Sequence, residues 1–147
     1  MSGLAGIEVR RLGPGDDALV MAAGELFDDP LRPDATARFL SAQGHHLWLA
    51  YDGEDPVGMV SGIEMTHPDK GTEMCLYELG VHETARRRGV AGALVGALLT
   101  YARECGCYGA WVPVDADNAP ALATYRSAGA VGDPGLQRVL SWTFDEG

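Results

Sequence analysis

The chain has 147 residues, 46% of them apolar and 22% charged, so it is long enough for one globular domain and too apolar for a disordered or fibrous protein. Its 21 acidic and 11 basic residues give a net charge of −10, which argues against a nucleic-acid partner because binding to phosphates favours a basic surface. No apolar run reaches the roughly 18–20 residues of a membrane-spanning helix, so no membrane partner is expected either.

The first part of the chain is predicted to alternate strands with two short helices. Apolar alternation or short apolar runs between turn residues predict strands over residues 7–11, 46–51, 57–65 and 73–81. Asp16 is expected to cap a helix over residues 16–27, and Asp34 to cap a second helix over residues 34–40. The apolar positions near helical spacing in the first helix are Ala18, Met21, Ala22 and Leu26.

The second part changes to a helical period. A helix is predicted over residues 89–104, ended by Gly106, followed by a strand over 108–114, a helix from Pro120 to about Gly129 and a last strand over 136–144. The long helix has one apolar face, formed by Val90, Leu94, Val95, Leu98 and Ala102. A strand–helix–strand unit implies a parallel pair, and the three consecutive strands imply antiparallel pairing. We therefore expect a single α/β (α+β) domain over residues 1–147, with a mixed, mostly antiparallel sheet and helices on both faces.

The segment over residues 78–92 has the features of an anion site. An apolar strand leads into three arginines and a glycine, and the loop opens directly onto a helix. Backbone N–H groups at a helix N-terminus lack internal partners, so this loop is suited to a phosphate or pyrophosphate. The alternative is that the arginines are solvated and the glycines serve a turn. The residues match neither a P-loop nor a dinucleotide-binding fingerprint.

Two motifs give the chain a family resemblance. Arg86-x-x-Gly89-x-Ala91 matches the acyl-CoA signature of the GNAT superfamily of N-acetyltransferases. A later stretch, Asn118-x-x-Ala121-x-x-x-Tyr125-x-x-x-Gly129, resembles that superfamily's later helix motif. The resemblance implies a sheet of six to seven strands with a central parallel pair, a bulge in the strand over 73–81, and acetyl-CoA as cofactor, released as coenzyme A.

The resemblance also implies which residues bind the cofactor. Backbone groups of Leu79, Gly80 and Val81 would bind the pantetheine arm and the acetyl carbonyl. The pyrophosphate would be held by the N–H groups of Arg87, Arg88, Gly89, Val90, Ala91 and Gly92, helped by the side chains of Arg86 and Arg88. Asn118 would lie near the cofactor arm, and Tyr125 would point its hydroxyl at the sulfur.

Amine acetylation needs a base and an acid. Roughly one alkyl amine in a thousand is neutral at pH 7, so a positioned carboxylate must remove its proton. We favour Glu78, then Asp115, then Glu73, whose face differs from that of Glu78 by the period of two along a strand. Alternatively, Glu78 is a strand carboxylate paired with an arginine. Tyr125 is the candidate acid for the leaving thiolate.

Other reactive side chains carry weaker expectations. Cys75, Cys105 and Cys107 are not favoured as nucleophiles and lack zinc spacing, and no metal site is expected. His45 and His46 fit a strand entrance better than a metal pair, and His82 is a minor candidate for the site. Gly92 and Gly96 are expected to allow close packing of the helix on the sheet. The reduced cysteines and the lack of a leader-like N-terminus indicate a cytoplasmic protein.

The acceptor site is expected to be acidic. The segments that should border it carry Asp28, Asp29, Glu64, Asp69, Asp115 and Asp117, which suits a cationic small-molecule amine. The run from Asp115 to Tyr125 resembles aminoglycoside 3-N-acetyltransferases of the GNAT type, with Asn118 where those enzymes have a further acid. The acidic cleft equally suits a polyamine or a peptide amine, and a non-catalytic acyl-CoA-binding regulator is the alternative from another class. A homodimer through the terminal strand is also expected.

Overall fold

One mixed sheet organises the computed structural model, which describes residues 4–132 and 138–144. The strands are β1 (Ile7–Leu12), β2 (His45–Asp52), β3 (Asp55–His67), β4 (Gly71–Val81) and β5 (Gly109–Trp111). The helices are α1 (Asp17–Ala22), α2 (Pro33–Ser41), α3 (Val90–Glu104) and α4 (Ala119–Ser127), with short 3-10 turns η1 (Gly24–Leu26) and η2 (Glu83–Ala85). The strands follow chain order across the sheet; β1 to β4 pair antiparallel, and β4 and β5 pair parallel.

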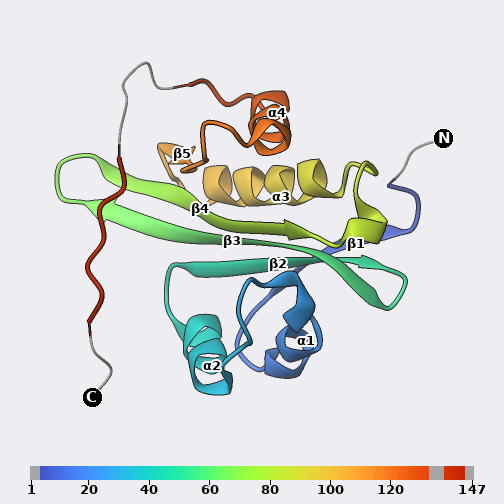
Figure 1. Cartoon of the computed structure of the whole chain (residues 1–147). Helices are drawn as coiled ribbons and strands as arrows, with labels where there is room; N and C mark the ends of the chain where they lie inside the picture. The colour runs from blue at the N-terminus through green and yellow to red at the C-terminus, as the bar shows by residue number, and fades with distance from the viewer. Residues whose placement is uncertain (1–3, 133–137, 145–147) are drawn as a thin grey trace.

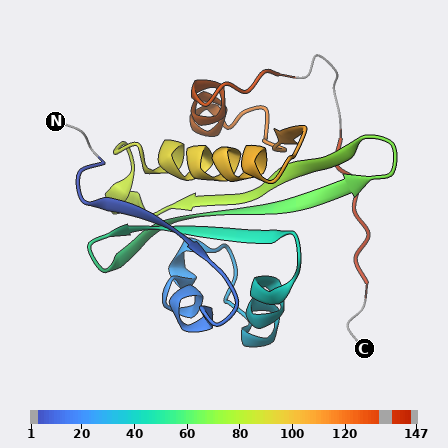
Figure 2. The same cartoon turned by 180° about the vertical axis from the view of Figure 1, so that it is seen from behind.

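Helices cover both faces of this sheet, as predicted. Figures 1 and 2 show α1 and α2 on one face and α3 and α4 on the other. β2 supplies both cores because its side chains alternate: Leu47 and Leu49 pack with the α1–α2 side, whereas Trp48 packs with the α3 side. Within the described residues, no helix has the length and apolar character that crossing a membrane requires.

The long helix forms with the predicted face inward. All five of its predicted apolar positions are buried in α3. The room for α3 comes from β3: a side chain at Gly58 would lie 2.9 Å from Leu94, and one at Gly62 would lie 2.9 Å from Leu98. The prediction that Gly92 and Gly96 make this contact was wrong, because both are exposed and a Cβ at either position would meet nothing within 4 Å.

The first predicted helix is shorter than expected. α1 ends at Ala22, and the chain continues as η1 instead of reaching Phe27. Its buried side is formed by Val20 with the adjacent Ala23, while Met21 is 39% exposed, so the predicted face was wrong. Asp16 does not cap α1 through its side chain; it accepts from the N–H of Gly13 at 2.8 Å instead.

The sheet has five strands in the described residues, so the expected six to seven are not found. The predicted strand over 108–114 is reduced to Gly109–Trp111, because the chain leaves β4 after Trp111. Of the predicted last strand, 136 and 137 lie outside the described residues, and 138–144 forms no strand. An alternating sequence needs a neighbouring strand for its hydrogen bonds, and the segment 138–144 meets none here.

A polar cluster joins three strands to the long helix. His46, which is 5% exposed, lies 2.7 Å from Glu64 through Nε2 and 2.8 Å from Arg11 through Nδ1. Arg11 also donates to the Tyr101 hydroxyl at 2.9 Å. Because a guanidinium only donates, Nδ1 of His46 must accept and Nε2 must carry the proton that Glu64 accepts. Glu64 is thereby held on the face of the sheet that α3 covers, opposite the face that α1 and α2 cover (Figure 1).

Candidate active site

A bulge in β4 decides which of its side chains face the α1–α2 side of the sheet. Ser61 pairs with Glu78 and Gly62 pairs with Leu76, so Tyr77 is an extra residue without a partner on β3. As a result, Tyr77 and Glu78 both line a pocket on the α1–α2 face, while Leu76 and Leu79 lie in the core under α3. An unbulged strand would have turned Glu78 toward α3.

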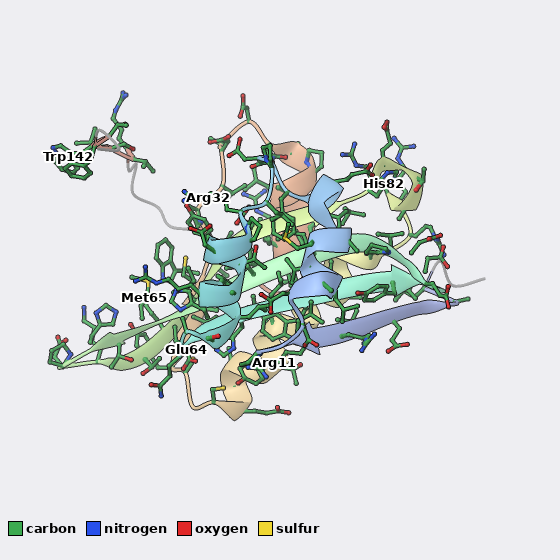
Figure 3. The ribbon with its side chains drawn as sticks, turned by 90° about the horizontal axis from the view of Figure 1, so that it is seen from below. Arg11, Arg32, Glu64, Met65, His82 and Trp142 are labelled. Atoms are coloured by element: carbon green, nitrogen blue, oxygen red, sulfur yellow. The ribbon has the colours of Figure 1, made fainter. Side chains whose placement is uncertain are left out.

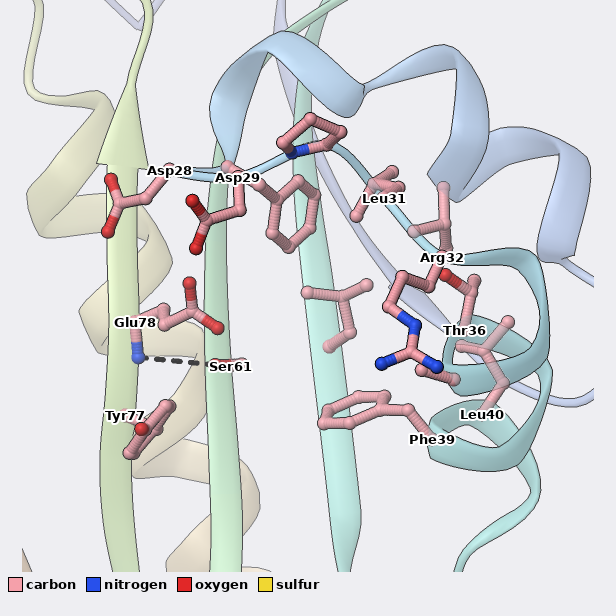
Figure 4. A pocket seen from close by; sticks show the side chains of 15 residues that line it. Asp28, Asp29, Leu31, Arg32, Thr36, Phe39, Leu40, Ser61, Tyr77 and Glu78 are labelled. Atoms are coloured by element: carbon pink, nitrogen blue, oxygen red, sulfur yellow. Dashed lines mark hydrogen bonds between the residues drawn. The ribbon is translucent and has the colours of Figure 1, made fainter. Parts of the chain in front are cut away.

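The pocket lies between β3, β4 and the segment from η1 to α2, and its volume is about 600 Å³. Asp28, Asp29 and Glu78 form an acidic wall, as Figure 4 shows. Most of the remaining lining is apolar and comprises Phe27, Leu31, Phe39, Leu40 and Leu47 among others. Three of the predicted acceptor-binding residues thus meet in one cavity, whereas Asp115 and Asp117 do not line it.

The surroundings of Glu78 favour its use as a base near neutral pH. Burial raises the pKa of the Glu78 carboxyl, and the negative charges of Asp28 and Asp29 raise it further. Its backbone N–H donates to Ser61 Oγ at 3.2 Å, which fixes the strand at the bulge. A carboxylate with a raised pKa accepts a proton more readily than an ordinary glutamate does.

Glu73 has the opposite surroundings. Hydrogen bonds from Tyr108, at 2.7 Å, and from His67, at 3.0 Å, lower the pKa of the Glu73 carboxyl. Its strand partner is Met65, which shares a face of β3 with Ser61, the partner of Glu78. The prediction that the two glutamates face opposite ways was therefore wrong, because the bulge shifts the period between them.

Gly80 lets the acidic wall approach β4. A Cβ at this position would lie 2.7 Å from the backbone oxygen of Leu26, the last residue of η1. Only glycine permits this contact without displacing the backbone. The chain reaches Asp28 two residues later, so Gly80 sets the distance between that wall and the bulge.

The predicted anion loop lies between η2 and α3. Arg87 and Gly89 both have left-handed backbones, with φ of 64° and 78°, and Gly89 precedes the first residue of the 15-residue helix α3. The N–H groups of the first turn have no acceptor within the helix, so they suit the oxygens of a pyrophosphate. Arg86 and Arg87 are exposed there, and Arg86 Nε donates to the Val81 carbonyl at 3.3 Å. These residues fit the phosphates of an acyl-CoA.

Arg88 links this loop to the end of β2. Its guanidinium donates to Asp52 Oδ2 at 2.8 Å. This ion pair holds the loop in shape at the position where Arg88 is predicted to help bind the pyrophosphate. His82 also has a local role: its Nδ1 accepts from the N–H of Thr84 and so caps η2.

The two candidates in the later motif lie on α4. Asn118 caps this helix, because its side chain accepts from the Ala121 N–H at 3.2 Å. Tyr125 packs against the core under α3, and burial raises the pKa of its hydroxyl. A tyrosine with a raised pKa stays protonated at neutral pH, as a proton donor must.

The sequence did not indicate Ser61 or Arg32 as pocket residues. Ser61 is a small polar residue inside a buried strand, and Arg32 precedes α2 without any motif. Of the three cysteines, Cys75 is buried, and burial raises the pKa of the thiols of Cys75 and Cys107. A raised pKa makes a thiol a weaker nucleophile at neutral pH.

Comparison with known proteins gives both a family and relatives. The model of the acetyltransferase (GNAT) family matches residues 17–130. Human N-acetyltransferase 8 is 33% identical over 97 residues, which are 65% of this chain and 43% of that protein. The chain thus spans less than half the length of this curated relative.

Two solved structures share the fold over nearly the whole chain. An aminoglycoside acetyltransferase, meta-AAC0020, from an uncultured soil metagenomic sample in complex with sisomicin superposes with a TM-score of 0.86 at 17% identity, covering 96% of this chain and 98% of that one. A second aminoglycoside acetyltransferase from such a sample, HMB0005, gives a TM-score of 0.80 at 26% identity, covering 93% and 99%. The family match, the bulged β4 and the loop before α3 agree, and the chain belongs to the GNAT acetyltransferase family.

Proposed function

We propose that this chain transfers the acetyl group of acetyl-CoA to a primary amine of a cationic small molecule. The observation that carries the proposal is the acidic wall of Asp28, Asp29 and Glu78 beside the bulge of β4. Acetyl-CoA, the donor that GNAT acetyltransferases use, supplies the acetyl group as a reactive thioester. Arg86, Arg87 and the first turn of α3 would hold its phosphates.

The amine is activated at the acidic wall. Asp28 and Asp29 attract the ammonium form, and Glu78 accepts its proton, directly or through water. The neutral nitrogen then forms a bond to the acetyl carbon, and the charge on the carbonyl oxygen is stabilised by a backbone N–H near Leu79. As the carbon–sulfur bond breaks, the Tyr125 hydroxyl gives its proton to the leaving thiolate, and the second proton that the reacting nitrogen loses returns through water to the tyrosine.

An aminoglycoside, modified at its 3-amino group, is the acceptor that we propose first. Several ammonium groups on one molecule match several carboxylates in one pocket. The run from Asp115 to Tyr125 and the likeness to HMB0005 support the same class. Asp115 and Asp117 are exposed just before α4 and remain candidates for contacts with a large acceptor outside the pocket.

A polyamine or the amine of a basic peptide is the second acceptor class, because the same wall attracts any flexible polycation. A regulator that binds acyl-CoA without turnover is the remaining alternative. The raised pKa of Glu78, which burial and two neighbouring aspartates cause, favours an enzyme, since a sensor needs no base.

A thiol-release assay with acetyl-CoA tests the proposal on gentamicin, sisomicin, kanamycin, spermidine and a lysine-rich peptide, with buffer alone as the blank. Turnover of the aminoglycosides with little on spermidine is the expected result. Turnover of spermidine or the peptide only would replace the acceptor class. Binding of acetyl-CoA without turnover of any amine would contradict the proposed activity.

A further inference from the structure

The acceptor pocket has two chemically different ends. Glu78 and the two aspartates form one end, and Figure 4 shows the Arg32 guanidinium projecting into the pocket from the opposite side, beside Phe39. Of the described residues that line the pocket, Arg32 alone is basic. A second ammonium group of an acceptor would be repelled at that end, although the first is attracted to the acidic wall.

The position of Arg32 is fixed by its backbone, whereas its side chain is weakly held. The Arg32 carbonyl accepts from the N–H of Thr36 at 2.9 Å, and Pro33 begins α2 directly after it. The guanidinium has an ion pair with Asp34 at 3.4 Å, and these side chains are 66% and 75% exposed. Such exposed pairs hold a side chain only weakly, and this one uses a single N–H of the five that a guanidinium carries.

The apolar side chains in the lining strengthen the effect. Phe39, Leu40 and Leu47 reduce the water around a bound acceptor, and charges interact more strongly where water is partly excluded. An acceptor that bridges the pocket therefore meets carboxylates at the reacting amine and a cation at its far end, within a largely apolar lining.

We infer that Arg32 is a specificity-determining residue that selects amines whose remote end carries a carboxylate or hydroxyl oxygens in place of a second ammonium group. The inference rests on the proposed function and deepens it. An amphoteric amine is held at both ends of the pocket. An aminoglycoside binds with a hydroxyl-bearing face, and not one of its further ammonium groups, toward Arg32.

Linear acceptors of matched length test this directly. We would compare an ω-aminoalkanoate, an alkylamine and an α,ω-diamine of equal chain length, in a series of increasing lengths, on the wild type, Arg32→Gln and Arg32→Glu. Arg38→Gln is the matched control, because Arg38 is exposed on α2, the helix that follows Arg32, and does not line the pocket.

For the wild type we expect kcat/KM to fall from the aminoalkanoate to the alkylamine to the diamine. Arg32→Gln should remove the advantage of the acceptor that carries a carboxylate, and Arg32→Glu should reverse the order of the three acceptors. Each substitution should change the ratio of kcat/KM between aminoalkanoate and diamine by roughly tenfold, the effect of one charged hydrogen bond. The change should appear in KM while kcat stays within about twofold, since Arg32 is remote from the reacting atoms. The same order of acceptors in Arg32→Glu as in the wild type would overturn the inference.

Aminoglycosides provide the second arm if the linear amines react too slowly. Arg32→Glu should lower KM for gentamicin by about tenfold, with kcat unchanged and Arg38→Gln like the wild type. An unchanged KM would overturn the inference while leaving the acetyl transfer intact. Absence of turnover with every amine in the wild type would overturn the proposed function, and the inference with it.

Discussion

Glu78 and Glu73 belong to one strand and one face, yet their carboxyl groups have pKa values shifted in opposite directions. Glu78 is partly buried beside two aspartates, which raise its pKa. Glu73 receives hydrogen bonds from Tyr108 and His67, which lower its pKa. The first arrangement suits the proposed base and the second suits a structural anion, so substitutions at the two positions can be compared directly.

Glu78→Gln is expected to lower kcat by about 10²–10⁴-fold, the usual contribution of a general base. The same change should stabilise the fold at neutral pH. A carboxyl whose folded pKa is raised contributes stability below its unfolded pKa and loses it as the pH rises through the folded pKa. Thermal melts from pH 4 to pH 8 should therefore show the gain in Tm of the variant growing with pH.

Glu73→Gln is the control for both readouts. Its lowered pKa stabilises the fold above the unfolded pKa, so this variant should lose stability at neutral pH and keep its turnover. Loss of activity in Glu73→Gln together with full activity in Glu78→Gln would contradict the assignment of the base.

Tyr125→Phe tests the acid. Without the hydroxyl, the leaving thiolate gains no proton from the protein, so kcat should fall by about 10²-fold or more. The affinity for acetyl-CoA should change little, since the ring and its packing remain. Titration calorimetry measures that affinity, and the thiol-release assay measures kcat. A non-catalytic binder would release no thiol with or without the substitution, and its affinity for acetyl-CoA would be unchanged.

At the scale of elements, glycines set how closely the segments approach one another. Gly80→Ala would bring a Cβ within 2.7 Å of the Leu26 oxygen, so η1 or β4 must move. We expect a loss of about 1–3 kcal/mol in the free energy of unfolding and a raised KM for the amine, because Asp28 follows η1. Urea denaturation and acceptor titrations measure the two effects.

Gly96→Ala is the matched substitution. Gly96 is an exposed position inside α3, and a Cβ built there would have no neighbour within 4 Å. Alanine there should stabilise the chain by about 0.4–1 kcal/mol through helix propensity and a less flexible unfolded chain. An equal loss of stability in Gly80→Ala and Gly96→Ala would show that the contact with Leu26 is not the reason for a glycine at position 80.

At the scale of the whole molecule, the segment over residues 138–144 has no partner in the described structure. Val139, Leu140, Trp142 and Phe144 are 78–86% exposed, and Figures 1 and 3 show this segment beside the sheet rather than in it. β5 ends the sheet with all three residues exposed. Because an apolar strand and an uncovered sheet edge complement each other, we expect the segment to add to the sheet of a second copy.

The double variant Trp142→Ser with Phe144→Ser should therefore be monomeric where the wild type is a dimer. Light scattering over a wide range of protein concentration measures the mass. Val131→Ser is the control, because Val131 is 93% exposed and lies outside the segment. A wild type that is monomeric at every concentration would contradict this expectation.

The predicted elements succeeded where one period continued over a long segment. The buried face of α3 and the antiparallel run β2–β4 follow from the sequence, because many side chains repeat the same spacing. The prediction for the first helix was wrong because only Val20 and Ala23 are buried there, and two residues are too few to define a buried face. The predicted last strand does not form over residues 138–144, because a strand depends on a neighbouring strand that its own sequence does not specify.

The sequence by itself predicted the long helix, the arginine–glycine loop before it and the acidic residues Asp28, Asp29 and Glu78 of the pocket. The tertiary structure alone decided that Glu78 faces the pocket, because one bulged residue at Tyr77 reverses the side to which a strand residue points. It alone separated Glu64 from that pocket and brought Arg32 into it. Such long-range placement arises from packing between segments far apart in the chain, which no local pattern of residues records.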